Sequence, residues 1–137
     1  MPDPIEEPAI ISPTDVPVLI VDDQLPFRTV ARTVVGVTPG FSVVAEAESG
    51  EQAVERAAEF APALVLMDIN LPGINGVEAT RRILATAGDT VVVLVSTYRA
   101  DDLPDGADRC GAVAYVHKED LSPVLLTSIW QQHRPAG

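Results

Sequence analysis

The sequence predicts an α/β protein built on a five-stranded parallel sheet with helices on both faces, a doubly wound arrangement. Short apolar runs, of the length typical of buried strands, alternate along the chain with segments of helical periodicity. Proline and glycine residues stand at several of the boundaries between these segments. Strict alternation of strand and helix favours parallel strands joined by crossover helices, because each helix must pack back onto the sheet.

Each expected strand is a run of mainly aliphatic residues. The first, Val18-Leu19-Ile20-Val21, contains no polar residue and reads as buried on both faces. The expected strands cover residues 18–21, 41–47, 64–67, 91–95 and 112–116.

The expected helices follow the strands in turn. The first begins at Pro26, which suits the first turn of a helix, and ends at Gly36. The last begins after Ser122, a good N-cap, and runs to about His133. Residues 51–60 and 75–87 supply two more, and alternation places another over residues 99–110. Pro104 and Gly106 fall inside that segment, so we expect this helix to be short, kinked or mobile.

Composition sets the class of protein. The 137 residues suffice for one domain with a sizeable core, which we place at residues 17–134, between a flexible acidic, proline-rich tail (1–16) and a C-terminal tail (135–137). The net charge of −11 argues against direct nucleic-acid binding. No apolar run is long enough to span a membrane, so the expected location is the cytoplasm.

Several strands are followed by polar residues of the kinds that bind cations and phosphate. Since the carboxyl ends of parallel strands meet at one edge of a sheet, we expect these residues to share a site. They are Asp22, Asp23, Asp68, Ser96, Thr97 and Lys118. Three carboxylates suit Mg²⁺, and a hydroxyl and an ammonium suit phosphoryl oxygens.

Each residue also has a simpler interpretation. Taken alone, the acidic pair is better explained as a helix cap, Asp68 as a turn residue before Pro72-Gly73, and Ser96 as another cap. Lys118 alone would be a solvated lysine at a strand end. The combination at matching strand ends is what favours a functional site, in which Asp68 is a metal ligand, a nucleophile or both.

At this point the chain resembles a response-regulator receiver domain of bacterial two-component signalling, over about residues 17–134. The resemblance is carried by the acidic pair, by Asp68 with Pro72 and Gly76 after it, by Ser96, and by an aromatic residue three positions before a lysine, here Tyr115 and Lys118. Residues 67–79 are most similar to receivers of the NarL/LuxR type, which usually carry a helix-turn-helix output domain that is absent here.

The resemblance implies a flavodoxin-like (βα)5 fold and a role for each residue. Asp68 would accept a phosphoryl group from a sensor histidine kinase, and Lys118 and Ser96 would hold its oxygens. Mg²⁺ would be bound by Asp23, Asp68 and the backbone carbonyl of Asn70, with Asp22 acting through water. Tyr115 and Ser96 would be the switch residues, and the fourth helix, fifth strand and fifth helix would form the output face and a possible homodimer contact.

The chain departs from the family at Glu119, where many receivers have proline after the lysine, which puts a cis peptide there in doubt. A receiver-like interaction module that works without phosphorylation is therefore a second hypothesis. A third hypothesis is an aspartate-nucleophile phosphatase, which would make the chain a conventional enzyme. Such enzymes use an Asp-x-Asp motif after a strand, which neither Asp22-Asp23 nor Asp68-Ile69-Asn70 supplies.

Trp130 is either a partner anchor or a packing residue, with packing the more frequent role. His117, His133 and Cys110 have simple structural interpretations.

Overall fold

The computed structural model describes residues 14–97 and 103–135 and confirms the predicted parallel α/β architecture. The strands are β1 (Val16–Val21), β2 (Phe41–Ala47), β3 (Leu64–Asp68), β4 (Val91–Ser96) and β5 (Ala114–His117). The described residues also form α1 (Leu25–Val37), α2 (Gly50–Phe60), α3 (Gly76–Thr86) and α4 (Pro123–His133). Two short 3₁₀ segments, η3 (Ala107–Arg109) and η4 (Lys118–Asp120), flank β5.

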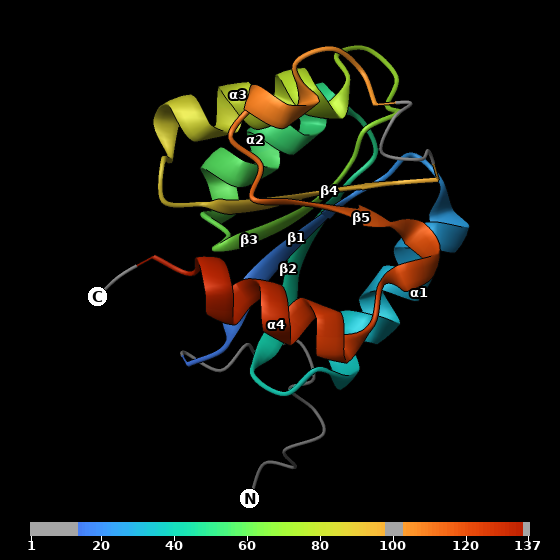
Figure 1. Cartoon of the computed structure of the whole chain (residues 1–137), viewed down its shortest axis with the longest axis vertical. Coiled ribbons are helices and arrows are strands. Elements are labelled where there is room, and N and C mark those ends of the chain that lie inside the picture. Colours follow the sequence, from blue (N-terminus) through green and yellow to red (C-terminus); the bar gives the residue numbers. More distant parts are fainter. Residues whose placement is uncertain (1–13, 98–102, 136–137) are drawn as a thin grey trace, which may run out of the picture.

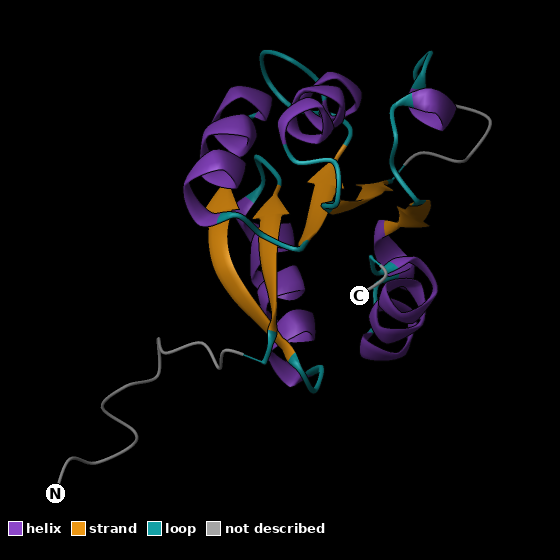
Figure 2. Cartoon of the chain, turned by 90° about the vertical axis from the view of Figure 1, so that its left-hand side faces the viewer, coloured by secondary structure: helices purple, strands orange, loops and turns teal. Residues whose placement is uncertain are grey.

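The strands form one sheet in the order β2-β1-β3-β4-β5, and every neighbouring pair is parallel. β3 lies at the centre, with Val21 of β1 level with Met67 on one side and Val95 of β4 level with Asp68 on the other. The strands splay with the twist of the sheet (Figure 2). The register therefore brings Asp68 between the ends of β1 and β4.

Helices cover both faces of the sheet, α2 and α3 on one and α1 and α4 on the other (Figure 1). Along β3, Leu64 and Leu66 face α1 and α4, whereas Val65 and Met67 face α2 and α3, as the two-residue period of a strand requires. All four side chains are at most 1% exposed. Burial on both faces explains why the central strands are continuous apolar runs.

Side chains cap three of the helices. Ser49, Asn75 and Ser122 each accept a hydrogen bond from the backbone amide three residues later, at 3.1, 2.9 and 3.1 Å. Pro residues stand in the first turns of α1 and α4, as predicted. These caps determine where the loops after the strands end and the helices begin.

The helix predicted over residues 99–110 is wrong for the described part of that segment. Residues 103–110 contain no α-helix and only the 3₁₀ turn η3. Pro104 lacks an amide donor, and Gly106 has a φ of 84°, which a right-handed helix cannot accommodate. The remainder of the predicted helix lies outside the described residues.

Smaller differences concern the ends of elements. β5 begins at Ala114 and ends at His117, rather than spanning 112–116. β1 begins at Val16, inside the segment assigned to the N-terminal tail, and residues 1–13 of that tail lie outside the described residues. No cis peptide occurs in the described residues, so the bond before Glu119 is trans.

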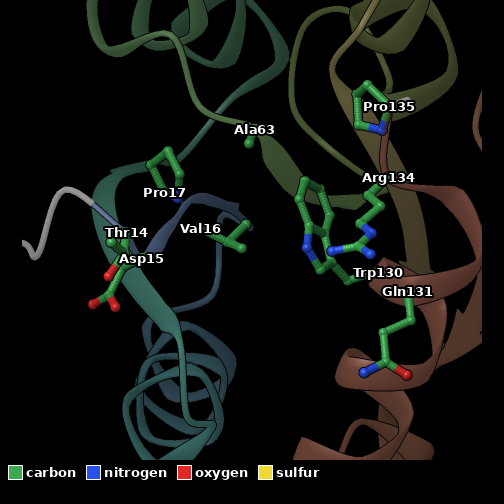
Figure 3. A pocket seen from close by; sticks show the side chains of 9 residues that line it. All are labelled: Thr14, Asp15, Val16, Pro17, Ala63, Trp130, Gln131, Arg134 and Pro135. Atoms are coloured by element: carbon green, nitrogen blue, oxygen red, sulfur yellow. The ribbon is translucent and has the colours of Figure 1, made fainter. Parts of the chain in front are cut away.

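A cavity of about 630 Å³ lies beside the first residues of β1, at the end of the sheet remote from Asp68 (Figure 3). Trp130 of α4 stands on its wall, and the Trp130 ring packs edge-on against Phe41 with 6.4 Å between centroids. The packing role predicted for Trp130 is confirmed, and the anchor role stays a prediction.

Cys110 is buried in the core, also as predicted. Within the described ranges, no helix is both long and apolar enough to cross a bilayer.

The loop after β3 returns so tightly that one residue must be glycine. The amide of Gly76 donates to the carbonyl of Ile69 at 2.9 Å, and a Cβ at Gly76 would lie 2.1 Å from the carbonyl oxygen of Asp68. That oxygen belongs to the strand backbone and cannot move aside without shifting β3. Gly76 thereby fixes the distance between α3 and the end of β3.

We expect Gly76→Ala to lower the free energy of unfolding by at least about 2 kcal/mol, because a methyl group collides with backbone. Gly36→Ala is the matched control, since Gly36 lies exposed in α1 with no atom within 4 Å of its Cβ position. It should stabilise by up to about 1 kcal/mol. Denaturant unfolding measures both, and equal effects would contradict the close approach.

Candidate functional site

The predicted site residues meet at the carboxyl edge of the sheet. Asp22 directly follows β1, Asp68 ends β3, Ser96 ends β4 and Lys118 directly follows β5. Asp22, Asp68 and Ser96 are 0%, 4% and 2% exposed. The central strand position of Asp68 thus puts a carboxylate from β1 and groups from β4 and β5 around it, as the strand-end pattern predicts.

Lys118 is the cation of this cluster. Its Nζ lies 2.6 Å from Oδ2 of Asp22 and 3.8 Å from Oδ2 of Asp68. The ammonium also lies 4.6 Å from the ring centroid of Phe27, a favourable cation–π distance. Its side chain is only 16% exposed, so these contacts hold a largely desolvated charge against the two buried carboxylates.

Asp68 is an unusually basic carboxylate. Burial and repulsion from Asp22 raise the pKa of Asp68 from its ordinary value of 3.8 to about 6, although the Lys118 ammonium opposes the rise. The amide of Asn70 donates to Oδ1 of Asp68 over 3.4 Å, a long contact that stabilises the ionised form only weakly. A buried, partly uncompensated carboxylate is well suited to act as a nucleophile or a metal ligand.

Three carboxylates converge on one point. Asp22, Asp23 and Asp68 each offer an oxygen, and these oxygens all lie within 4.8 Å of one another. Oδ1 of Asp22 accepts from the amide of Gln24 at 2.8 Å, whereas buried Oδ2 has no hydrogen-bond partner among the described residues and faces only the Lys118 ammonium. Hard oxygen donors with this spacing fit a divalent cation such as Mg²⁺.

A pocket of about 390 Å³ opens over the carboxylates. Its walls come from the loops after β1, β3, β4 and β5, and the residues that line it are Asp23, Gln24, Pro26, Phe27, Asp68, Asn70, Ser96, Thr97 and Lys118. Asn70 is thus at the site, as predicted. Tyr115 does not line this pocket. It lies half-buried on the α2 and α3 side of β5, beside a cavity of about 200 Å³ that it shares with Leu103 and Ala107.

Sequence reasoning missed two residues of the site. Arg28 of α1 is buried, and its Nη1 donates to the backbone carbonyl of Asp22 at 2.7 Å, while Nε pairs with Glu46 of β2 at 3.2 Å. Phe27 contributes the ring beneath Lys118. As one apolar residue in a helical segment, Phe27 gives no sequence signal of a role in the site, and no local pattern links Arg28 to Glu46, eighteen residues away.

Comparison with known proteins decides the family. The sequence model described as "Response regulator receiver domain" matches residues 18–129. The chain belongs to the response-regulator receiver domain family.

Relatives of this receiver domain are response regulators. "Response regulator GacA" of Pseudomonas protegens is 41% identical over 101 residues, covering 74% of this chain and 47% of the relative. "Transcriptional regulatory protein DegU" of Brevibacillus brevis is 33% identical over 119 residues, covering 87% and 50%. The chain therefore spans about half the length of these curated relatives.

Solved structures agree on the flavodoxin-like fold. The response regulator domain of Thermotoga maritima CheB superposes with a TM-score of 0.78 at 32% identity, covering 90% of this chain and 99% of that one. A two-component response regulator of the LuxR family from Aurantimonas sp. SI85-9A1 gives 0.77 at 31% identity, with 88% of each chain covered. These two receivers thus resemble this domain in both sequence and architecture.

We expect Asp68→Asn to raise the free energy of unfolding of the receiver domain at pH 8 without divalent cations. Because the pKa of Asp68 is about 6 when folded against 3.8 ordinarily, the folded state binds this proton more tightly, and stability falls as the pH rises through that interval. Asparagine does not ionise, so the gain should be roughly 2–3 kcal/mol at pH 8 and vanish near pH 4.

Denaturant unfolding of both proteins between pH 4 and pH 8 measures this difference. Asp89→Asn, at an exposed aspartate in the turn before β4, is the control and should reproduce the wild-type profile. Identical pH profiles for wild type and Asp68→Asn would show that ionising Asp68 does not lower the free energy of unfolding.

Proposed function

We propose that this receiver domain is a phosphorylation-dependent signalling switch that accepts a phosphoryl group on Asp68 from a sensor histidine kinase, in the cytoplasm. The observation that carries the proposal is the buried Asp68 carboxylate, which opens into a pocket and is flanked by two further carboxylates and one ammonium. The family membership supports the class of function, and the placement of the side chains supports the assignment of roles.

The acidic cluster supports a resident Mg²⁺. Asp23, Asp68 and the backbone carbonyl of Asn70 would hold the ion, with Asp22 acting through water. When bound, it would neutralise charge on the carboxylates and on the incoming phosphoryl oxygens. This assignment rests on the convergence of three carboxylates on one point, against the single ammonium of Lys118.

The chain's own groups account for the transfer step. A carboxylate oxygen of Asp68 attacks phosphorus, a new P–O bond forms, and the P–N bond to the kinase histidine breaks. The electron pair of that bond stays on the ring nitrogen, and the histidine, already protonated on its other nitrogen, leaves as neutral imidazole. The Lys118 ammonium pairs with a phosphoryl oxygen, and the Ser96 hydroxyl donates a hydrogen bond to another. Phe27 and Pro26 line the pocket and limit water around these groups.

The signalling output would depend on how Ser96 and Tyr115 move when Asp68 is phosphorylated. Movement of Ser96 toward the phosphate vacates space beside β4, and inward rotation of Tyr115 fills it. The cavity that Tyr115 already shares with Leu103 and Ala107 provides room for a change of rotamer. The face formed by η3, β5 and α4 would then differ between the two states and form the contact with a partner or a second copy.

We expect one phosphoryl group, about 80 Da, to appear on the intact protein after incubation with acetyl phosphate and Mg²⁺. Asp68→Asn should show no gain, and EDTA should prevent it. Lys118→Met should slow the gain about a hundredfold, because a buried positive charge that faces the transition state is lost. Intact-protein mass spectrometry measures all four conditions. A folded wild-type protein that gains no mass would favour the interaction module that acts without phosphorylation.

Mg²⁺ alone should raise the thermal midpoint of unfolding, since a ligand that binds only the folded state stabilises it. At one hundred times its dissociation constant the gain is about 2.7 kcal/mol. Asp23→Asn should abolish the gain, because it removes an exposed carboxylate of the cluster with little effect on packing. Calorimetry with and without Mg²⁺ tests this, and an unchanged shift in Asp23→Asn would exclude Asp23 as a ligand.

A further inference from the structure

The ring of His117 bridges two backbone groups at the edge of the site. His117 is the last residue of β5, and its Nε2 lies 3.0 Å from the carbonyl oxygen of Thr97, the residue that follows β4. Its Nδ1 accepts a hydrogen bond from the amide of Glu119 at 3.3 Å. One side chain therefore contacts the backbone beyond Ser96 and the backbone beyond Lys118.

Only one protonation state satisfies both contacts. A carbonyl oxygen can only accept, so Nε2 must carry a proton, and a backbone amide can only donate, so Nδ1 must be free of one. The amide at position 119 is available because this residue is glutamate. A proline there, as many receivers have, would offer no donor. The bridge therefore depends on the combination of His117 with a non-proline residue two positions later.

The backbone that carries Lys118 has few other restraints. β5 has only four residues and lies at the edge of the described sheet, paired with β4 alone. The turn η4 is closed by a long contact, 3.5 Å from the Leu121 amide to the Lys118 carbonyl. The two hydrogen bonds of the His117 ring are therefore a large part of what fixes the backbone at Lys118.

The bridge also spans the two walls of the phosphoryl pocket. Ser96 and His117 are register partners on β4 and β5, and Ser96, Thr97 and Lys118 all line the pocket. Holding Thr97 to Glu119 through the ring sets the distance between the hydroxyl side and the ammonium side of the site. Small changes in that distance slow a reaction whose rate depends on where the charged groups stand.

We propose that His117, as a neutral imidazole protonated on Nε2, is a positioning residue that sets Lys118 against Ser96 for phosphoryl transfer. The proposal rests on the function proposed above for Asp68. His117 touches neither the carboxylates nor the pocket, so it acts through Lys118 and Thr97 and leaves the cation ligands in place.

The test compares phosphorylation rates of variants of the 137-residue chain with acetyl phosphate and Mg²⁺. His117→Leu removes both hydrogen bonds. His117→Asn keeps an acceptor near the Glu119 amide, and His117→Gln keeps a donor that reaches toward the Thr97 carbonyl. Glu119→Ala is the control, because it retains the backbone amide and removes only the side chain.

We expect the maximum rate of His117→Leu to fall roughly tenfold, with Asn and Gln partly restoring it and Glu119→Ala matching wild type. The Mg²⁺ concentration for half-maximal rate should stay within about twofold, because the carboxylates are untouched. Long-range proton–nitrogen NMR of the His117 ring should show the Nε2-protonated tautomer.

A His117→Leu rate within about twofold of wild type would overturn the proposal even if the variant were less stable. The ring would then only cap the turn η4 and would not position Lys118. The Nδ1-protonated tautomer would overturn it as well. If wild type gained no phosphoryl group at all, the function proposed for Asp68 would fail and the positioning role with it. That outcome is distinct from a wild type and a His117→Leu that are both phosphorylated at the same rate.

Discussion

The structure of the site depends on two carboxylates, Asp22 and Asp68, buried at the ends of adjacent strands and held by one ammonium. Lys118 lies closer to Asp22, at 2.6 Å, than to Asp68, at 3.8 Å. Asp22 is therefore the better compensated of the two, and Asp68 keeps a raised pKa. This asymmetry leaves Asp68, and not Asp22, as the carboxylate that gains most from a new positive charge or from a covalent bond at its oxygen.

The rest of the domain holds that cluster in place. Arg28 is tied to Glu46 and, at 3.6 Å, to Glu48, and it donates to the carbonyl of Asp22, so α1 and β2 together fix the acidic loop after β1. Gly76 fixes the loop after β3 by its contact with the backbone of Asp68. Among the described site residues Asp22, Asp68, Ser96 and Lys118, Lys118 alone follows an edge strand, which is why the bridge through His117 matters for its position.

Much of this arrangement was predictable from the sequence, because it follows from local patterns. The central strands are continuous apolar runs, and parallel strands bring their carboxyl ends together, so Asp22, Asp68, Ser96 and Lys118 were placed at one edge without further information. The ring of Phe27 under the ammonium and the buried guanidinium of Arg28 were not foreseen, since Lys118 and Glu46, with which they interact, come from elements distant in sequence. Alternation placed a helix over residues 99–110, and Pro104 and Gly106 were expected only to shorten or distort it. Over residues 103–110 their backbone requirements exclude an α-helix altogether.

Charge balance supports the proposal that the site takes a cation and a phosphoryl group together. Three carboxylates against one ammonium leave two negative charges in a partly buried pocket, and a single divalent cation offsets them. A phosphoryl group adds further negative charge, yet it also converts Asp68 from a desolvated carboxylate into an acyl phosphate whose charge lies on outer oxygens. Those oxygens would extend into the pocket, which Lys118 and Ser96 line. Phosphorylation would therefore relieve the repulsion between Asp22 and Asp68 and draw the ends of β4 and β5 toward the phosphate, which couples a local change of charge to the β5 edge of the sheet.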